Sequence, residues 1–166
     1  MSLKIRSGLI FFSVENIYLY FMIDANASHS LSRFIEAQNT IYDQVLWELK
    51  SGKKSRHWMW FIFPQMKGLG MSSVSNFYGI SGIEEAMLYW NHDLLGTRLR
   101  ECIGILLALP EKDANKIFGY TDAMKLRSCL TLFNLVDDSS ERWTEKCLQQ
   151  NFAGLKDKRT LLLLGV

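Results

Sequence analysis

Residues 56–73 of this 166-residue chain read Arg-His-Trp-Met-Trp-Phe-Ile-Phe-Pro-Gln-Met-Lys-Gly-Leu-Gly-Met-Ser-Ser. Six bulky apolar residues follow one another from 58 to 63, and Pro64 ends the run. A run of this length is too short to span a membrane, so it predicts an element buried in a core. The glycines and serines after Pro64 predict a polar turn. The stretch therefore forms either the wall and floor of a pocket or a core element followed by a tight connection.

The composition is that of a soluble globular protein. Hydrophobic residues make up 48% of the chain and charged residues 22%, which excludes disorder over most of its length. The net charge of +2 creates no field that would favour nucleic acid or an anionic membrane. One basic cluster, Lys50, Lys53, Lys54 and Arg56, is interpreted as a solvated helix end rather than a phosphate-binding track.

Residues 1–30 differ from the rest of the chain. An apolar stretch over 8–23 follows a basic start, as in a secretory leader, but Glu15 interrupts it. The stretch is also too short and too polar at its centre for a transmembrane helix. We interpret residues 1–30 as an extension that is disordered, loosely packed or absent from the native product, with Met22 as an alternative start. We expect a single cytoplasmic domain over 31–166.

Apolar residues recur with helical spacing from residue 31 onward. The first expected helices are a short one capped by Ser30 with Phe34 and Ile35 inward, one from 41 to Gly52, a turn from Ser73 to Tyr78, and one opened by a capping box at 81–84 with Ile83, Met87 and Trp90 inward. Two helices follow, from Leu95 to Pro110 and from Asp113 to Gly119. The last three are one started by Thr121 or Asp122 with Leu126, Cys129, Leu130 and Phe133 inward, one opened by Ser139 or Ser140 with Trp143, Cys147 and Leu148 inward, and a closing one over 157–164. Few segments alternate with period two, so no sheet is expected. The prediction is an all-α, compact multihelical domain of about six to eight helices.

The residues 57–65, with Gly68-Leu69-Gly70 and Ser72, resemble the signature of the domain-of-unknown-function family numbered 1810. The resemblance covers about residues 31–164, and its further matching segments are Tyr78, 85–86, 94–100, 117–119 and 125–128. It implies a compact, mainly α-helical fold and no activity, because the family is uncharacterised. Some relatives are labelled calpastatin-like. Inhibitory segments of that kind are disordered, whereas 13% of this chain is aromatic.

Motifs of common catalytic sites are absent from the sequence. There is no phosphate-binding loop, no His-Glu-x-x-His and no Gly-x-Ser-x-Gly. The three cysteines, Cys102, Cys129 and Cys147, lack the spacing of a zinc site and are interpreted as buried free thiols. We therefore predict no metal site, and the sequence points to no particular cofactor.

The candidate ligand contacts are His57, Trp60, Gln65, Gly68, Gly70, Ser72, Ser73, Lys125 and Ser128. His57 is the candidate catalytic group, because a histidine can serve as acid or base, although no partner is identifiable for it. Trp58 and Trp60 point roughly opposite ways, so one is expected in the core, and the other is either a stacking platform or a core residue as well. Gln65 suits a hydrogen-bonding ligand edge or a buried backbone group.

The turn after Pro64 and a later helix supply the remaining candidates. The glycines of the turn and the helix start at Ser73 offer backbone N–H groups to an anion, or form only a tight connection. Lys125 and Ser128 lie three apart on one helix face, which is either part of the same site or solvated surface.

Two functions follow from these candidates. The first is binding of a small anionic or nucleotide-like ligand, with an indole stacked on its flat portion and Lys125 holding its charge. The second is a non-enzymatic interaction module in which the central stretch is only core. A concave, partly exposed cluster of the candidates supports the first; burial of Trp58, Trp60 and His57 without an adjacent cavity supports the second.

Overall fold

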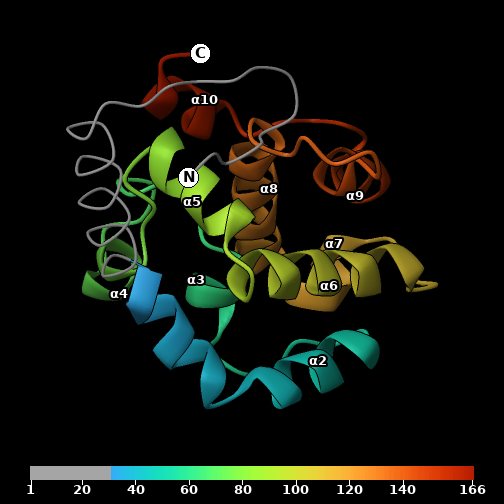
Figure 1. Ribbon diagram of the computed structural model, residues 1–166. Coiled ribbons are helices and arrows are strands. Elements are labelled where there is room, and N and C mark those ends of the chain that lie inside the picture. The colour runs from blue at the N-terminus through green and yellow to red at the C-terminus, as the bar shows by residue number, and fades with distance from the viewer. Residues whose placement is uncertain (1–30) are drawn as a thin grey trace, which may run out of the picture.

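Helices form nearly all the regular structure in residues 31–166, the part of the chain that the computed structural model describes (Figure 1). They are residues 31–39, α2 (Tyr42–Lys50), α3 (Met59–Ile62), α4 (Ser73–Phe77), α5 (Ile83–Asn91), α6 (Leu95–Ala108), α7 (Ala114–Phe118), α8 (Tyr120–Asn134), α9 (Trp143–Phe152) and α10 (Lys158–Leu164). These residues contain no strand, only an isolated parallel bridge between Met66 and Ile80. The all-α prediction is confirmed.

The number of helices is larger than predicted. Residues 31–166 contain ten helical segments instead of six to eight, and three of these segments, α3, α4 and α7, are only four or five residues long. The predictions on residues 1–30, including the cap at Ser30, concern residues outside the described part of the chain.

Helix α8 is the centre of the fold. It contacts α3, α5, α7, α9 and α10, and Figure 1 shows it in the middle of the molecule. Its predicted stripe is fully buried, and further side chains around the helix are buried as well: Leu126, Cys129, Leu130 and Phe133 in the stripe, with Ala123 and Leu132 beside it. A helix that is apolar on several sides is packed on several sides, which is why the other helices surround α8.

The central stretch packs into the core beside α7. The rings of Trp58, Phe63 and Phe118 form an aromatic cluster with centroid separations of 6.1–6.3 Å. Trp58 and Phe63 have no exposed surface, whereas Trp60 is only half-buried. One tryptophan is thus in the core and the other reaches the surface, which is one of the two arrangements that the sequence left open.

Several helix starts differ from the prediction. Ser81 pairs with Glu85 rather than Glu84, through its N–H and hydroxyl. Helix α8 follows directly on Gly119, whose φ of 76° makes the turn between α7 and α8 and favours glycine. Helix α9 begins after Arg142, not at Ser139 or Ser140. Helix ends depend on local backbone geometry that apolar periodicity does not report.

Two predicted surface assignments are wrong. Lys54 is not part of a solvated helix end, because its side chain is only 7% exposed and pairs with Asp122 of α8 at 2.6 Å, whereas Arg56 stays 53% exposed although it pairs with Glu48 of α2 at 2.8 Å. Met87 is 49% exposed, because α5 buries the neighbouring face that carries Ala86, Tyr89 and Trp90.

The three cysteines are buried and unbonded, as predicted. Burial raises the pKa of Cys102 and of Cys147 to about 12, so both are thiols at neutral pH. Within residues 31–166, no group of side chains is arranged to bind a metal. No helix there is long and apolar enough to cross a membrane.

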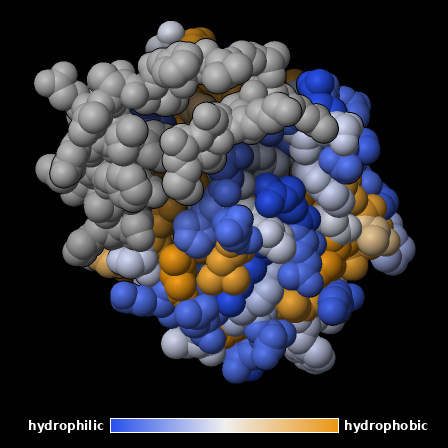
Figure 2. Space-filling model, viewed as in Figure 1, coloured by the Kyte–Doolittle hydropathy of each residue, from blue (hydrophilic) through white to orange (hydrophobic). Residues whose placement is uncertain are grey.

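The described surface in the view of Figure 2 is largely hydrophilic, with hydrophobic residues gathered in small groups. Such scattered apolar residues are normal on a folded domain. This face therefore offers no broad apolar interface.

Asp157→Ala is expected to lower the free energy of unfolding by about 1–2 kcal/mol. Asp157 caps α10 by accepting hydrogen bonds from the N–H and hydroxyl of Thr160, and its own N–H donates to Thr131 of α8. Urea unfolding of Asp113→Ala provides the control, because Asp113 caps the five-residue α7 at an exposed position. Equal losses in both variants would contradict this role of the buried cap.

Candidate functional site

Lys125 of α8 and Gly70, which follows ten residues after Trp60, both approach the indole of Trp60. The ammonium group of Lys125, from α8, lies 3.8 Å from the centroid of the Trp60 ring. A Cβ atom added to Gly70 would lie 3.8 Å from the indole of Trp60 and 2.7 Å from Ser75. Glycine is therefore needed at position 70 for this close approach. The structure brings together three of the predicted ligand contacts: Trp60, Gly70 and Lys125.

Near this indole, two positively charged side chains share a single negatively charged one. Asp122 accepts contacts from Lys125 at 2.7 Å and from Lys54 at 2.6 Å. The side chains of Lys54, Asp122 and Lys125 are only 7%, 19% and 19% exposed. Burial opposes ionisation of Asp122, but the hydrogen bonds and charges of the two lysines outweigh it and lower its pKa. Two ammonium groups thus share one carboxylate, and neither has another acidic partner within residues 31–166.

The loop before Trp60 is held by the buried carboxylate of Glu48. This carboxylate accepts hydrogen bonds from the N–H groups of Ser55 and Arg56, from the Arg56 guanidinium and from the Trp58 indole. The N–H of Lys54 also donates to the carbonyl of Ile117 in α7. The backbone leading to Trp60 is therefore fixed to both α2 and α7.

The backbone after Trp60 is held by Gln38. Its amide N–H₂ donates to the carbonyl of Phe61 at 2.7 Å and to the hydroxyl of Tyr89 at 2.9 Å. Gln38 is 1% exposed, so these hydrogen bonds form in a medium of low dielectric constant. They tie the backbone of α3 to the helix of residues 31–39 and to α5.

Gln65 and Gly68 lie in the turn that follows α3. Gln65 is 8% exposed, and its side-chain amide makes no hydrogen bond to any residue from 31 to 166. The amide atoms keep some contact with solvent, since they are not among the fully buried unpaired atoms. Gly68 has a φ of 91°, a conformation that favours glycine, and faces Leu163 of α10.

The other predicted contacts are placed differently. His57 is exposed and makes no hydrogen bond or ion pair within the described chain. The hydroxyl of Ser72 caps α4 by accepting the N–H of Ser75, and Ser73 is the exposed first residue of that five-residue helix. The hydroxyl of Ser128 donates to the carbonyl of Met124 at 3.1 Å. The hydroxyls of Ser72 and Ser128 are already engaged in these hydrogen bonds. As ligand contacts, His57, Ser72, Ser73 and Ser128 remain predictions.

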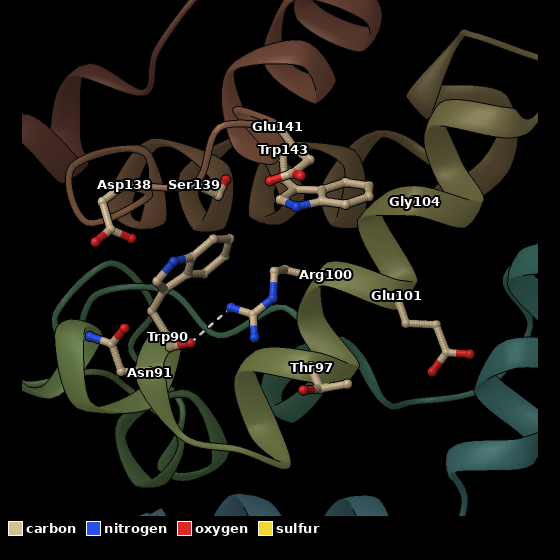
Figure 3. Close-up of a pocket in the computed structure, with 10 residues that line it drawn as sticks. All are labelled: Trp90, Asn91, Thr97, Arg100, Glu101, Gly104, Asp138, Ser139, Glu141 and Trp143. Carbon is tan, nitrogen blue, oxygen red and sulfur yellow. Dashed lines mark hydrogen bonds between the residues drawn. The ribbon is translucent and has the colours of Figure 1, made fainter.

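A cavity elsewhere in the structure, at Arg100, involves residues that the sequence analysis did not select. Its volume is about 560 Å³, and its walls come from α5, α6, α9 and the loop before α9 (Figure 3). Trp90, Arg100 and Trp143 contribute its largest side chains. In the sequence, only the presence of the two tryptophans, a rare residue type, could have indicated this cavity. The sequence analysis places Trp90 and Trp143 in the core only.

Comparisons with known proteins agree with the fold and with the resemblance read from the sequence. Residues 28–164 match the model of a family described as "Protein of unknown function (DUF1810)". The chain is 44% identical to the conserved hypothetical protein Rv1873 from Mycobacterium tuberculosis, and the match covers 82% of this chain and 96% of that one. The crystal structure of that protein superposes with a TM-score of 0.78. No curated protein matches the chain.

Proposed function

Because the chain belongs to the DUF1810 family, whose function is unknown, we propose a function from the site itself: binding of a small anionic ligand with a flat, nucleotide-like portion at Trp60 and Lys125. The observation that carries the proposal is the pair of half-buried lysines that share Asp122 beside a half-buried indole. Partly buried charges are usually matched by opposite charges. An anion placed here would provide the missing match.

The chemistry of binding follows from the side chains present. The ammonium group of Lys125 would move from the face of Trp60 to the anion while it remains near Asp122. The indole would then be free to stack on a flat ring, for which its area and rigidity suit it. The unpaired amide of Gln65 can both donate and accept.

The test is a ligand screen of the full chain by tryptophan fluorescence and thermal shift. The probes are inorganic phosphate, AMP, ADP, a dinucleotide and ribose 5-phosphate. Lys125→Met is expected to weaken binding of the best probe about 10- to 100-fold, because it removes one charge-assisted contact worth about 1.5–3 kcal/mol. Lys146→Met is the matched control, since Lys146 is an exposed lysine of α9 without an ion pair.

Trp60→Phe adds a second measurement. It keeps an aromatic ring, so the fold should be retained, while the indole signal from this position is lost. Probe binding should still raise the melting temperature of this variant, but with less fluorescence quenching than in the wild type. Equal affinity of the wild type and Lys125→Met for every probe would overturn the proposal and favour an interaction module.

A further inference from the structure

The cavity at Arg100 places the positive charge of this residue between two indoles. Arg100 reaches from α6 toward α5, where its guanidinium donates to the carbonyl of Trp90 at 3.0 Å and lies 5.0 Å from the centroid of that ring. The indole of Trp143 packs on α6 opposite Gly104, where an added Cβ would lie 3.3 Å from the ring. Figure 3 shows Arg100 between these two tryptophans.

The guanidinium of Arg100 is mostly unpaired. A guanidinium has five N–H donors, and the bond to Trp90 is the one hydrogen bond that Arg100 makes in residues 31–166. It forms no ion pair there, although three carboxylates line the cavity. One of these, Glu101, accepts a hydrogen bond from the hydroxyl of Tyr42 at 2.7 Å and points away from the cavity in Figure 3.

The opposite rim is acidic. Asp138 and Glu141 lie in the loop before α9, and neither forms an ion pair with a residue of the described chain. The hydroxyl of Ser140 donates to Glu141, while Asp138 has no side-chain partner there. The cavity therefore presents one positive and one negative pole that do not neutralise each other directly.

We propose that this cavity binds a small zwitterion, with its carboxylate on Arg100 and its ammonium group against Asp138 and Glu141. A carboxylate fits the planar donors of a guanidinium in a bidentate manner. A simple anion is repelled by the acidic rim, and a simple cation is repelled by Arg100. The methylene groups between the two charges would pack on Trp143. This inference does not depend on the site at Trp60.

The test titrates the full-length protein with straight-chain amino acids of increasing length, from glycine to 6-aminohexanoate. Binding is followed by the indole N–H signal of Trp143 in ¹H–¹⁵N spectra, assigned with Trp143→Phe. We expect one length to bind at least tenfold more tightly than the carboxylic acid or the amine of the same length, and that length reports the separation of the poles. A carboxylic acid or an amine that binds as tightly as the zwitterion would overturn the proposal.

Variants of the two poles are expected to have different effects. Arg100→Gln should weaken binding of the best zwitterion at least tenfold. The double variant Asp138→Asn, Glu141→Gln should also weaken it but should strengthen binding of the carboxylic acid, because the repulsion is removed. Arg159→Gln, at an exposed position of α10, is the control. An unchanged preference for the zwitterion in the double variant, which alters exposed residues and should fold, would overturn the proposal even if Arg100→Gln unfolds.

Discussion

Glu48→Gln is expected to lower the free energy of unfolding by about 3 kcal/mol at pH 7. Glu48 is fully buried and accepts four hydrogen bonds, one of them from its ion-pair partner Arg56. Glutamine can keep an oxygen for the three donors at Oε2, but it then places an N–H₂ group against the Arg56 guanidinium, which loses both its acceptor and its counter-charge. Removing one partner of a buried pair typically costs about 3–5 kcal/mol, and retention of one amide oxygen places this variant at the lower end.

The effect of Glu48 should depend on pH. Burial by itself would raise the pKa of this carboxyl group, but hydrogen bonds from Ser55, Trp58 and Arg56 outweigh burial and lower the pKa from 4.5 to about 2. A group whose pKa is lowered on folding stabilises the protein above its unfolded-state pKa. That contribution, about 3 kcal/mol for this shift, is lost as the pH falls from about 4.5 to 2.

Urea unfolding of the wild type and Glu48→Gln between pH 7 and pH 2.5 measures this contribution. The difference between the two proteins should be constant above about pH 5 and should shrink at lower pH, because protonation removes the same interactions from the wild type. Glu36→Gln is the control, since Glu36 is exposed and has no hydrogen bond in the described chain. A difference that stays constant down to pH 2.5 would show that Glu48 does not act through its charge.

The sequence predicted those parts of the fold that depend on local signals. The apolar stripe of α6 and its end before Pro110, and the start of α7 at Asp113, lie where the residue pattern placed them. The burial of Trp58 and the partial exposure of Trp60 match one of the two interpretations of their spacing. Such features depend on neighbours along the chain, which a single sequence contains.

Features that depend on distant partners could not be predicted in the same way. Lys54 looks like an exposed charge in the sequence, and only the folded chain reveals Asp122 of α8, 68 positions later, as its partner. The approach of Lys125 to Trp60 was only one of two interpretations of a polar helix face. The cavity at Arg100 was missed because its indoles come from α5 and α9, 53 positions apart in the chain.

Gly96→Ala is expected to destabilise the protein by about 3 kcal/mol or more, and the reason lies at the same cavity. Gly96 is buried in the first turn of α6, where an added Cβ would overlap the carbonyl oxygen of Trp90 and lie 2.9 Å from its carbonyl carbon. Overpacking against side chains typically costs about 1–3 kcal/mol. Backbone atoms cannot turn aside as side chains do, so α5 and α6 would have to separate.

Gly104→Ala in the same helix is the matched control. Its Cβ would meet only the edge of the Trp143 ring, at 3.3 Å, and this half-buried ring can shift by a few tenths of an ångström. Alanine also gains about 1 kcal/mol of helix propensity over glycine, so the stability of this variant should change by less than about 1 kcal/mol. Thermal unfolding of both variants compares them directly. Similar losses would show that the cost arises from filling space along α6 in general. A large loss in Gly96→Ala alone would assign it to the contact with the Trp90 carbonyl, the group that holds Arg100 in place.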